Sequence, residues 1–320
     1  MNTGGPSNTS SLLFFFPSFT NCFLPGSPPI SCLDPWYIAA GVVILLSSML
    51  GIPANITVIG KLIQHVCDSS MSQHLIFSLT LSDLFCLLIL LVGNIVFCLG
   101  LHLNLSICQL LFFLLFFCNI TNSNILVLIS IQRYYQVLRP EKWIKVVRTW
   151  QRVLLFSVWL LGALLAIPAV FFLSEVKNKE KRIDEGSCKN LRVSPVLEWS
   201  YILFTVYSHV VLLSCYPLLA RKVNRIQRSS KEKLRITKLV LHIMAVSLVF
   251  AFIALIFRTV YVTLSLTASE KLLYMSKVLI FMECFYFFKH TLNPLLYCFV
   301  GQHESTAKTL RIFIPLNDSS

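Results

Sequence analysis

Charged side chains are scarce in this sequence: Asp, Glu, Lys and Arg together make up 13% of its 320 residues. Soluble domains carry about 25%, so this chain has too few charges to cover a water-facing surface. Apolar residues reach 56%, and 25 residues are phenylalanine. The composition excludes a disordered chain, a disulfide-stapled miniprotein and a soluble enzyme. It predicts a protein that crosses a membrane several times.

Other absences narrow the class of membrane protein. No internal repeat relates one half of the sequence to the other, which disfavours a transporter built from inverted repeats. The apolar stretches contain no cluster of metal-ligating residues and no nucleophile with a neighbouring base, so we expect no enzyme. The net charge of +13 resides mostly in the connections between apolar stretches, where it indicates membrane topology rather than nucleic-acid binding.

Seven stretches are apolar and long enough, at about 20 residues each, to cross a bilayer as helices. They are Tyr37–Gly60, Leu75–Leu99, Ile107–Ile131, Val153–Leu173, Tyr201–Leu219, Leu239–Leu266 and Val278–Val300. The sequence therefore predicts an all-α membrane protein with a seven-helix bundle over residues 36–300. A flexible N-terminal segment (residues 1–35) precedes the bundle, and a tail (residues 301–320) follows it.

The positions of Lys and Arg predict how the bundle is oriented. The set of connections that includes the tail holds 17 of these residues against five acids. The set that includes the N-terminus holds eight against seven acids, with Glu198 counted among the seven. Because basic loops stay in the cytosol, we expect an extracellular N-terminus, a multi-pass plasma-membrane protein, and a basic cytosolic face that contacts membrane lipids. Asn8 and Asn104 then begin glycosylation sequons on the outer side.

Polar residues inside the spans are costly, and each one suggests a function. Asp83 lies midway along the second span, and Asn55, Asn122 and Asn293 lie in three others. They could form scattered hydrogen bonds between helices or one shared pocket. We favour a pocket around Asp83, because an isolated carboxylate in the bundle needs hydrogen-bond donors or a cation.

Several motifs with characteristic spacing cover nearly the whole chain. They are Leu79–Asp83, Gln132-Arg133-Tyr134 with Pro140 beyond it, Trp159 in the fourth span, and Asn293-Pro294-Leu295-Leu296-Tyr297 in the seventh. Together with seven spans and an external N-terminus, these motifs resemble the rhodopsin-like family of G-protein-coupled receptors. The resemblance implies an extracellular small-molecule or peptide ligand, a heterotrimeric G protein as partner, and arrestin as a further partner.

The same resemblance implies roles for particular residues. Cys108 and Cys188 would form a disulfide between the third helix and the second outer loop, and a short amphipathic helix would follow the seventh span. A sodium ion would lie at Asp83, unless the ammonium of Lys289, one turn above Asn293, takes its place. Coupling to the G protein would involve the Gln132-Arg133-Tyr134 motif, Tyr216, Tyr297 and the basic loops.

The sequence departs from the family pattern at three places, one of which is the fifth span, where the usual mid-membrane proline is missing and Pro217 lies late instead. Gln132 replaces the acid that usually precedes the arginine, so we expect a weaker restraint on Arg133 in the resting state. The stretch Phe250–Ile253 lacks the usual Trp and Pro of the sixth span, and without a proline kink this helix should be straighter and stiffer. These departures leave open an atypical receptor that binds ligand without G-protein output.

The ligand class is read from finer resemblances. The end of the seventh span and the stretch Arg235–Val240 are most similar to leukotriene-type chemoattractant receptors, so an anionic lipid mediator is the first expectation. A chemokine or small-peptide receptor is the alternative, although the connection Thr263–Lys277 lacks the cysteine that chemokine receptors usually carry there. Arg258 would meet a ligand carboxylate, or it would pair internally with Glu283, the second candidate for ligand binding.

Overall fold

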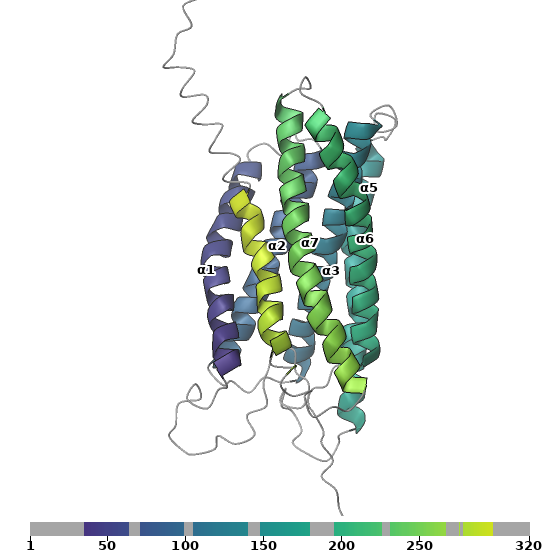
Figure 1. The fold of residues 1–320 in the computed structure, drawn as a ribbon. Helices are drawn as coiled ribbons and strands as arrows, with labels where there is room; N and C mark the ends of the chain where they lie inside the picture. The colour runs from purple at the N-terminus through teal and green to yellow at the C-terminus, as the bar shows by residue number, and fades with distance from the viewer. Residues whose placement is uncertain are drawn as a thin grey trace, which may run out of the picture.

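The computed structural model describes residues 35–63, 71–98, 105–139, 148–179, 195–225, 231–266, 275 and 278–296. Apart from Arg139, the residues in these ranges are helical. The helices are α1 (Pro35–Ile63), α2 (Met71–Cys98), α3 (Leu105–Leu138), α5 (Arg148–Lys179), α6 (Pro195–Arg225), α7 (Lys231–Leu266) and a last helix over residues 278–296, yellow in Figure 1. The labels pass over α4, so α5, α6 and α7 are the fourth, fifth and sixth helices of the bundle.

These helices confirm the seven-helix bundle that the hydropathy pattern predicts, with one helix for each predicted span. Five of the described helices (α1, α2, α3, α6 and α7) are apolar and long enough to cross a membrane, whereas the apolar part of α5 is the shorter stretch Arg152–Pro168. The predicted amphipathic helix after the seventh span, the tail and residues 1–34 lie outside the described residues.

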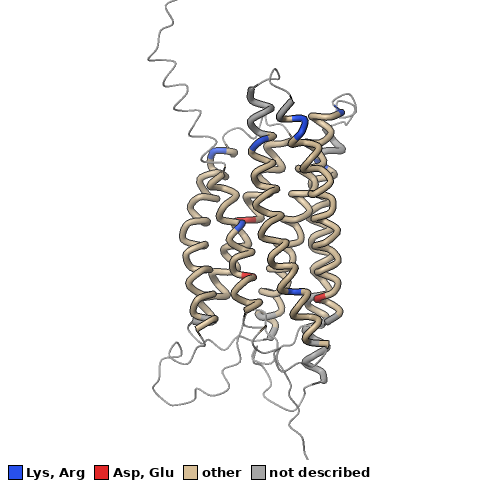
Figure 2. Tube along the Cα trace, viewed as in Figure 1, with Lys and Arg blue, Asp and Glu red and all other residues tan. Residues whose placement is uncertain are grey.

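The outer surface of the bundle is apolar. Large side chains such as Leu46, Phe156, Leu203 and Phe252 are between 54% and 69% exposed. In Figure 2 the helices are coloured tan over most of their length, with few blue or red segments between their ends. Such an apolar surface is stable against lipid tails rather than against water. The helices are also stable in lipid, because their backbone N–H and C=O groups bond one another within each helix.

The third helix, α3, occupies the centre of the packing, because it contacts α2, α5, α6 and α7. A small residue permits one of these close approaches: a Cβ added at Gly162 of α5 would collide with the side chain of Thr121 on α3. Such small residues are typical of interfaces between membrane helices.

Two apolar clusters form the interior, and a polar layer separates them. One cluster contains Leu79 of α2 and Ile125 of α3, and the other contains Cys86 of α2 and Cys118 of α3. Along α2, Asp83 lies between the members of these two clusters. Along α3, Asn122 does the same, so both polar residues meet at one level of the bundle.

Candidate functional site

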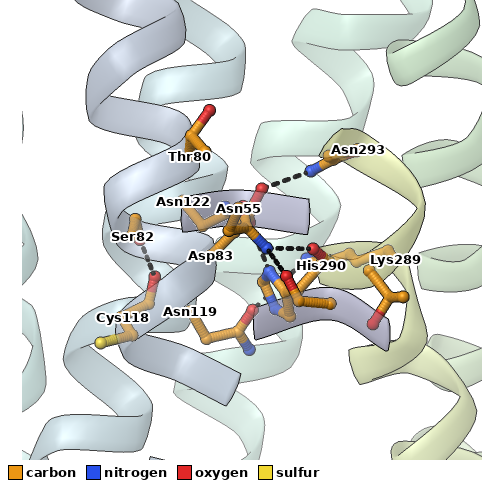
Figure 3. A network of polar contacts seen from close by, with 12 residues as sticks. Asn55, Thr80, Ser82, Asp83, Cys118, Asn119, Asn122, Lys289, His290 and Asn293 are labelled. Atoms are coloured by element: carbon orange, nitrogen blue, oxygen red, sulfur yellow. Dashed lines mark hydrogen bonds and ion pairs between the residues drawn. The ribbon is translucent and has the colours of Figure 1, made fainter. Parts of the chain in front are cut away.

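The carboxylate of Asp83 is fully buried and accepts hydrogen bonds from three other side chains, a group that we call the Asp83 site. Asn122 Nδ2 donates to Asp83 Oδ1 at 2.6 Å, and His290 Nδ1 lies 2.5 Å from the same oxygen. Asn293 Nδ2 donates to Oδ2 at 2.9 Å. Figure 3 shows these groups converging from α2, α3 and the last helix. The shared polar pocket expected around Asp83 is therefore present as a set of direct contacts.

The first helix reaches this site through the side chain of Asn55, which contacts the backbone of the last helix. Asn55 Nδ2 donates to the carbonyl oxygen of His290 at 3.2 Å and to that of Gly51 at 2.9 Å. Gly51 makes the approach possible, because a Cβ there would stand 2.7 Å from Oγ1 of Thr291 and 3.3 Å from its Cα. Asn55 thus holds the last helix against α1 beside Asp83.

Lys289 does not take the place predicted for it beside Asp83. Its ammonium donates to the hydroxyl of Tyr286 at 2.6 Å and to Asn119 Oδ1 at 3.5 Å. The next residue, His290, contacts Asp83 instead. Neighbouring residues on a helix point about 100° apart, so only one of the two can face α2 at this level; the sequence alone does not show which.

A second buried group, the Arg258 triad, consists of one guanidinium and two carboxylates. Arg258 Nη2 lies 2.7 Å from Glu283 Oε1, and its Nη1 lies 2.9 Å from Glu198 Oε2. The guanidinium also stands over the ring of Tyr201, 4.2 Å from the centroid. Arg258, Glu198 and Glu283 are each 5% exposed or less. The internal pairing with Glu283, one of the two alternatives for Arg258, is what the structure contains.

The position of Glu198 corrects the sequence-based interpretation. We counted Glu198 among the acids of an outer loop because the fifth apolar stretch begins only at Tyr201. In the structure α6 begins at Pro195, and Glu198 is 2% exposed within its first turn. Hydropathy along the chain excludes a charged residue from an apolar stretch. It cannot show that this charge is compensated by Arg258, which lies on another helix.

A bridge of polar side chains connects the Arg258 triad to the neighbourhood of the Asp83 site. Asn119 of α3 contacts the hydroxyl of Tyr201, and its Oδ1 accepts from the hydroxyl of Tyr286 at 2.9 Å. Lys289 contacts both Asn119 and Tyr286 and precedes His290 in the chain. The buried polar groups therefore follow one another from the outer half of the bundle to its middle.

The Arg133 region lies at the opposite end of α3. Arg133 is 4% exposed, and its Nη1 donates to Gln136 Oε1 at 3.1 Å. Gln132 turns away from it, because its Nε2 donates to the hydroxyl of Ser72 on α2 at 3.1 Å. Within the part of the chain that is described, no carboxylate pairs with Arg133, and the weaker restraint expected from Gln132 stays a prediction.

The remaining predicted residues are placed as follows. Tyr134 has an edge-to-face contact with Tyr135, and Tyr216 packs against the apolar cluster of Leu79 and Ile125. Tyr297, Cys188, Asn8 and Asn104 lie outside the described residues, as does the side chain of Cys108. The predicted disulfide and the glycosylation sites therefore stay predictions. Among the described residues, no three His, Cys, Asp or Glu side chains gather in a way that could hold a metal ion.

The seven helices and the buried Asp83 site define a helical membrane-protein bundle, and comparison with known proteins supplies the family. The profile of the family described as 7 transmembrane receptor (rhodopsin family) matches residues 54–297. The chain belongs to this family. Its members are receptors rather than enzymes, and they have an extracellular ligand and a G protein as partners.

Individual relatives are distant. The chain is 27% identical over 250 residues to the C-C chemokine receptor type 9 of Ovis aries, covering 65% of this chain and 67% of that receptor. It is 26% identical over 255 residues to the receptor of the same name from Homo sapiens, with the same coverage. It is also 27% identical over 135 residues to the gonadotropin-releasing hormone II receptor of Clarias gariepinus, covering 40% of this chain and 35% of that receptor.

Proposed function

We propose that this G-protein-coupled receptor resides in the plasma membrane and recognises a cationic group of an extracellular peptide or chemokine. Of the two ligand classes that the sequence leaves open, we favour the chemokine or small peptide over the anionic lipid mediator. The leukotriene-type alternative requires a guanidinium that can receive a ligand carboxylate, whereas the peptide alternative requires a carboxylate that can receive an ammonium or guanidinium.

The charge of the Arg258 triad is the observation that carries the choice. Two carboxylates face one guanidinium, so the triad has one excess negative charge when all three groups are ionised. Arg258 already contacts both carboxylates, and an anionic ligand would have to displace one of them. Oε1 of Glu198 is buried and accepts no hydrogen bond from any described residue, so acceptor capacity remains for a cation.

The triad is also placed where an extracellular ligand would approach. With the N-terminus outside, the beginnings of α6 and of the last helix face the outer side of the membrane, as does the end of α7. Glu198 is in the first turn of α6, and Arg258 is eight residues before the end of α7. Eight residues of helix correspond to about 12 Å. The names of the relatives support the same ligand class, since they are receptors for a chemokine and for a releasing hormone.

A second candidate is the atypical receptor that binds ligand without G-protein output. The contact between Gln132 and Ser72 is the observation that supports it, because Gln132 then differs from the usual acid of the family both in charge and in what it contacts. The signalling receptor and the atypical receptor would differ only in whether ligand binding activates a G protein. Nucleotide exchange on the G protein, measured beside arrestin recruitment, separates them.

The ligand class is tested with two panels on cells that express the receptor. One panel contains chemokines and short basic peptides, and the other contains lipid mediators with a free carboxylate, leukotrienes included. We expect activation by a member of the peptide panel. Activation by acidic lipids alone would overturn the proposal.

The role of the carboxylates is tested with the active peptide and its form acetylated at the terminal and lysine amines. Glu283→Gln should lower the potency of the native peptide by about 30-fold or more, as expected when one partner of a desolvated charge pair is removed. Glu283→Asp, which keeps the charge, is the matched control and should lose less. The acetylated peptide should be weak on both variants, and an equal loss for both peptides on Glu283→Gln would contradict charge recognition at this residue.

A further inference from the structure

The groups that directly contact the Asp83 carboxylate do not fit the sodium ion that the family resemblance implies. Hard cations take oxygen ligands from carboxylates, amide carbonyls and water. The groups that contact the Asp83 carboxylate are instead three nitrogen donors, from Asn122, His290 and Asn293. A carboxylate has about four lone-pair sites, so these donors use most of them.

We propose that His290 replaces the sodium ion at Asp83, so that this receptor is independent of sodium. An imidazole donates from Nδ1 in its protonated form and in one neutral tautomer. The donor lies 2.5 Å from Asp83 Oδ1 and so occupies a position at which a cation would otherwise coordinate. His290 therefore supplies from the protein itself the favourable contact that a bound cation would supply.

The imidazole is held firmly in this place. His290 is 0% exposed, and its ring stacks on that of Phe287 with centroids 6.0 Å apart and planes 25° apart. Its backbone carbonyl accepts the hydrogen bond from Asn55 described above. A cation could take the place of the imidazole at Asp83 Oδ1 only if this ring moved away, and the packing around it opposes such a movement.

Removing the imidazole should create the cation site that it now prevents. The side-chain oxygens of Asn55 and Asn293 are buried and accept no hydrogen bond from any described residue. Asn293 donates to the Asp83 carboxylate, and Asn55 lies beside it (Figure 3). In His290→Ser a hydroxyl oxygen would join them and the Asp83 carboxylate. The variant would then offer several oxygens to a hard cation.

The experiment compares the thermal unfolding of the purified full-length receptor in NaCl and in choline chloride at equal ionic strength. The buried free thiols Cys86, Cys118 and Cys284 allow a thiol-reactive dye to report unfolding. The wild-type protein should unfold at the same temperature in both salts. A ligand that binds only the folded state raises its stability, so His290→Ser should gain a rise of about 2–4 °C in NaCl.

Two further variants assign the effect to particular groups. The double variant His290→Ser with Asp83→Asn should lose the sodium-dependent rise, because the carboxylate that binds the ion is gone. Lys289→Met should stay independent of sodium, since the ammonium of Lys289 contacts Tyr286 and Asn119 rather than Asp83.

Three results would overturn the proposal. The first is a sodium-specific rise in the wild-type protein that Asp83→Asn abolishes. The second is the absence of any sodium-specific rise in folded His290→Ser. The third is a sodium-specific rise in Lys289→Met, which would assign the displacement of the ion to Lys289.

Discussion

In the Arg258 triad, we expect loss of the arginine to lower the stability of the protein much more than loss of one of the two acids. In Arg258→Met two carboxylates remain buried with no cation between them, because Glu283 and Glu198 both depend on the same guanidinium. Removing one partner of a buried ion pair costs about 3–5 kcal/mol. In Glu283→Gln, by contrast, Arg258 keeps Glu198, and the new amide oxygen still accepts a hydrogen bond. We therefore expect a loss of only about 1 kcal/mol for that variant.

Thermal unfolding of the purified variants measures the difference. At about 2–4 °C per kcal/mol for a protein of this size class, Arg258→Met should unfold at least about 6 °C below the wild-type protein, and Glu283→Gln about 2–4 °C below it. Neutralising both acids in the Arg258→Met background, with Glu198→Gln and Glu283→Gln, should recover part of the loss, since no charge is then left unpaired.

The control is Lys289→Met, which removes the other buried cation of the outer polar groups. Its described partners are the neutral groups of Tyr286 and Asn119, so its loss should cost much less than that of Arg258. The reasoning is wrong if Arg258→Met unfolds no earlier than Glu283→Gln, or if the triple variant is less stable than Arg258→Met alone.

Three further predictions concern other parts of the bundle. Gln132→Asp should lower ligand-free signalling at equal surface expression, because an acid there can pair with Arg133 and favour the inactive state by about 1–3 kcal/mol; unchanged or raised output would refute this. Gly51→Ala should destabilise the protein by about 1–3 kcal/mol through overpacking against the last helix, seen as a lower unfolding temperature. Cys108→Ala should cost several kcal/mol by opening the disulfide with Cys188, and normal surface expression and binding would refute the pairing.

The fold could be predicted well from the sequence because the bilayer imposes a simple rule on length and polarity. Each span needs about 20 apolar residues, and all seven helices follow from that rule. The ends of helices are less predictable, as Glu198 shows. The predicted fifth span begins only at Tyr201, after this residue, and the burial of Glu198 depends on an arginine 60 residues away in the chain.

The Asp83 site could be predicted in part. Asp83, Asn55, Asn122 and Asn293 stand out as polar residues in apolar stretches, and their meeting follows from the cost of burying a lone carboxylate. His290 was missed because it follows Lys289 directly, and the place beside Asp83 was assigned to the charged Lys289. Which of two adjacent residues faces a neighbouring helix depends on the rotation of the helix about its axis, and packing with α1 and α2 sets that rotation. The signal that could have found it is the spacing of three residues between His290 and Asn293, which places both on one helix face.

We expect this receptor to activate a G protein through the Arg133 region, and one measurement tests this activation directly. The purified receptor is placed in lipid nanodiscs with a heterotrimeric G protein and the activating peptide from the panel, and nucleotide exchange on the Gα subunit is followed over time. We expect the peptide to accelerate exchange with the wild-type receptor and not with Arg133→Ala. Exchange that stays at the receptor-free rate while the peptide binds and arrestin is recruited would contradict this expectation.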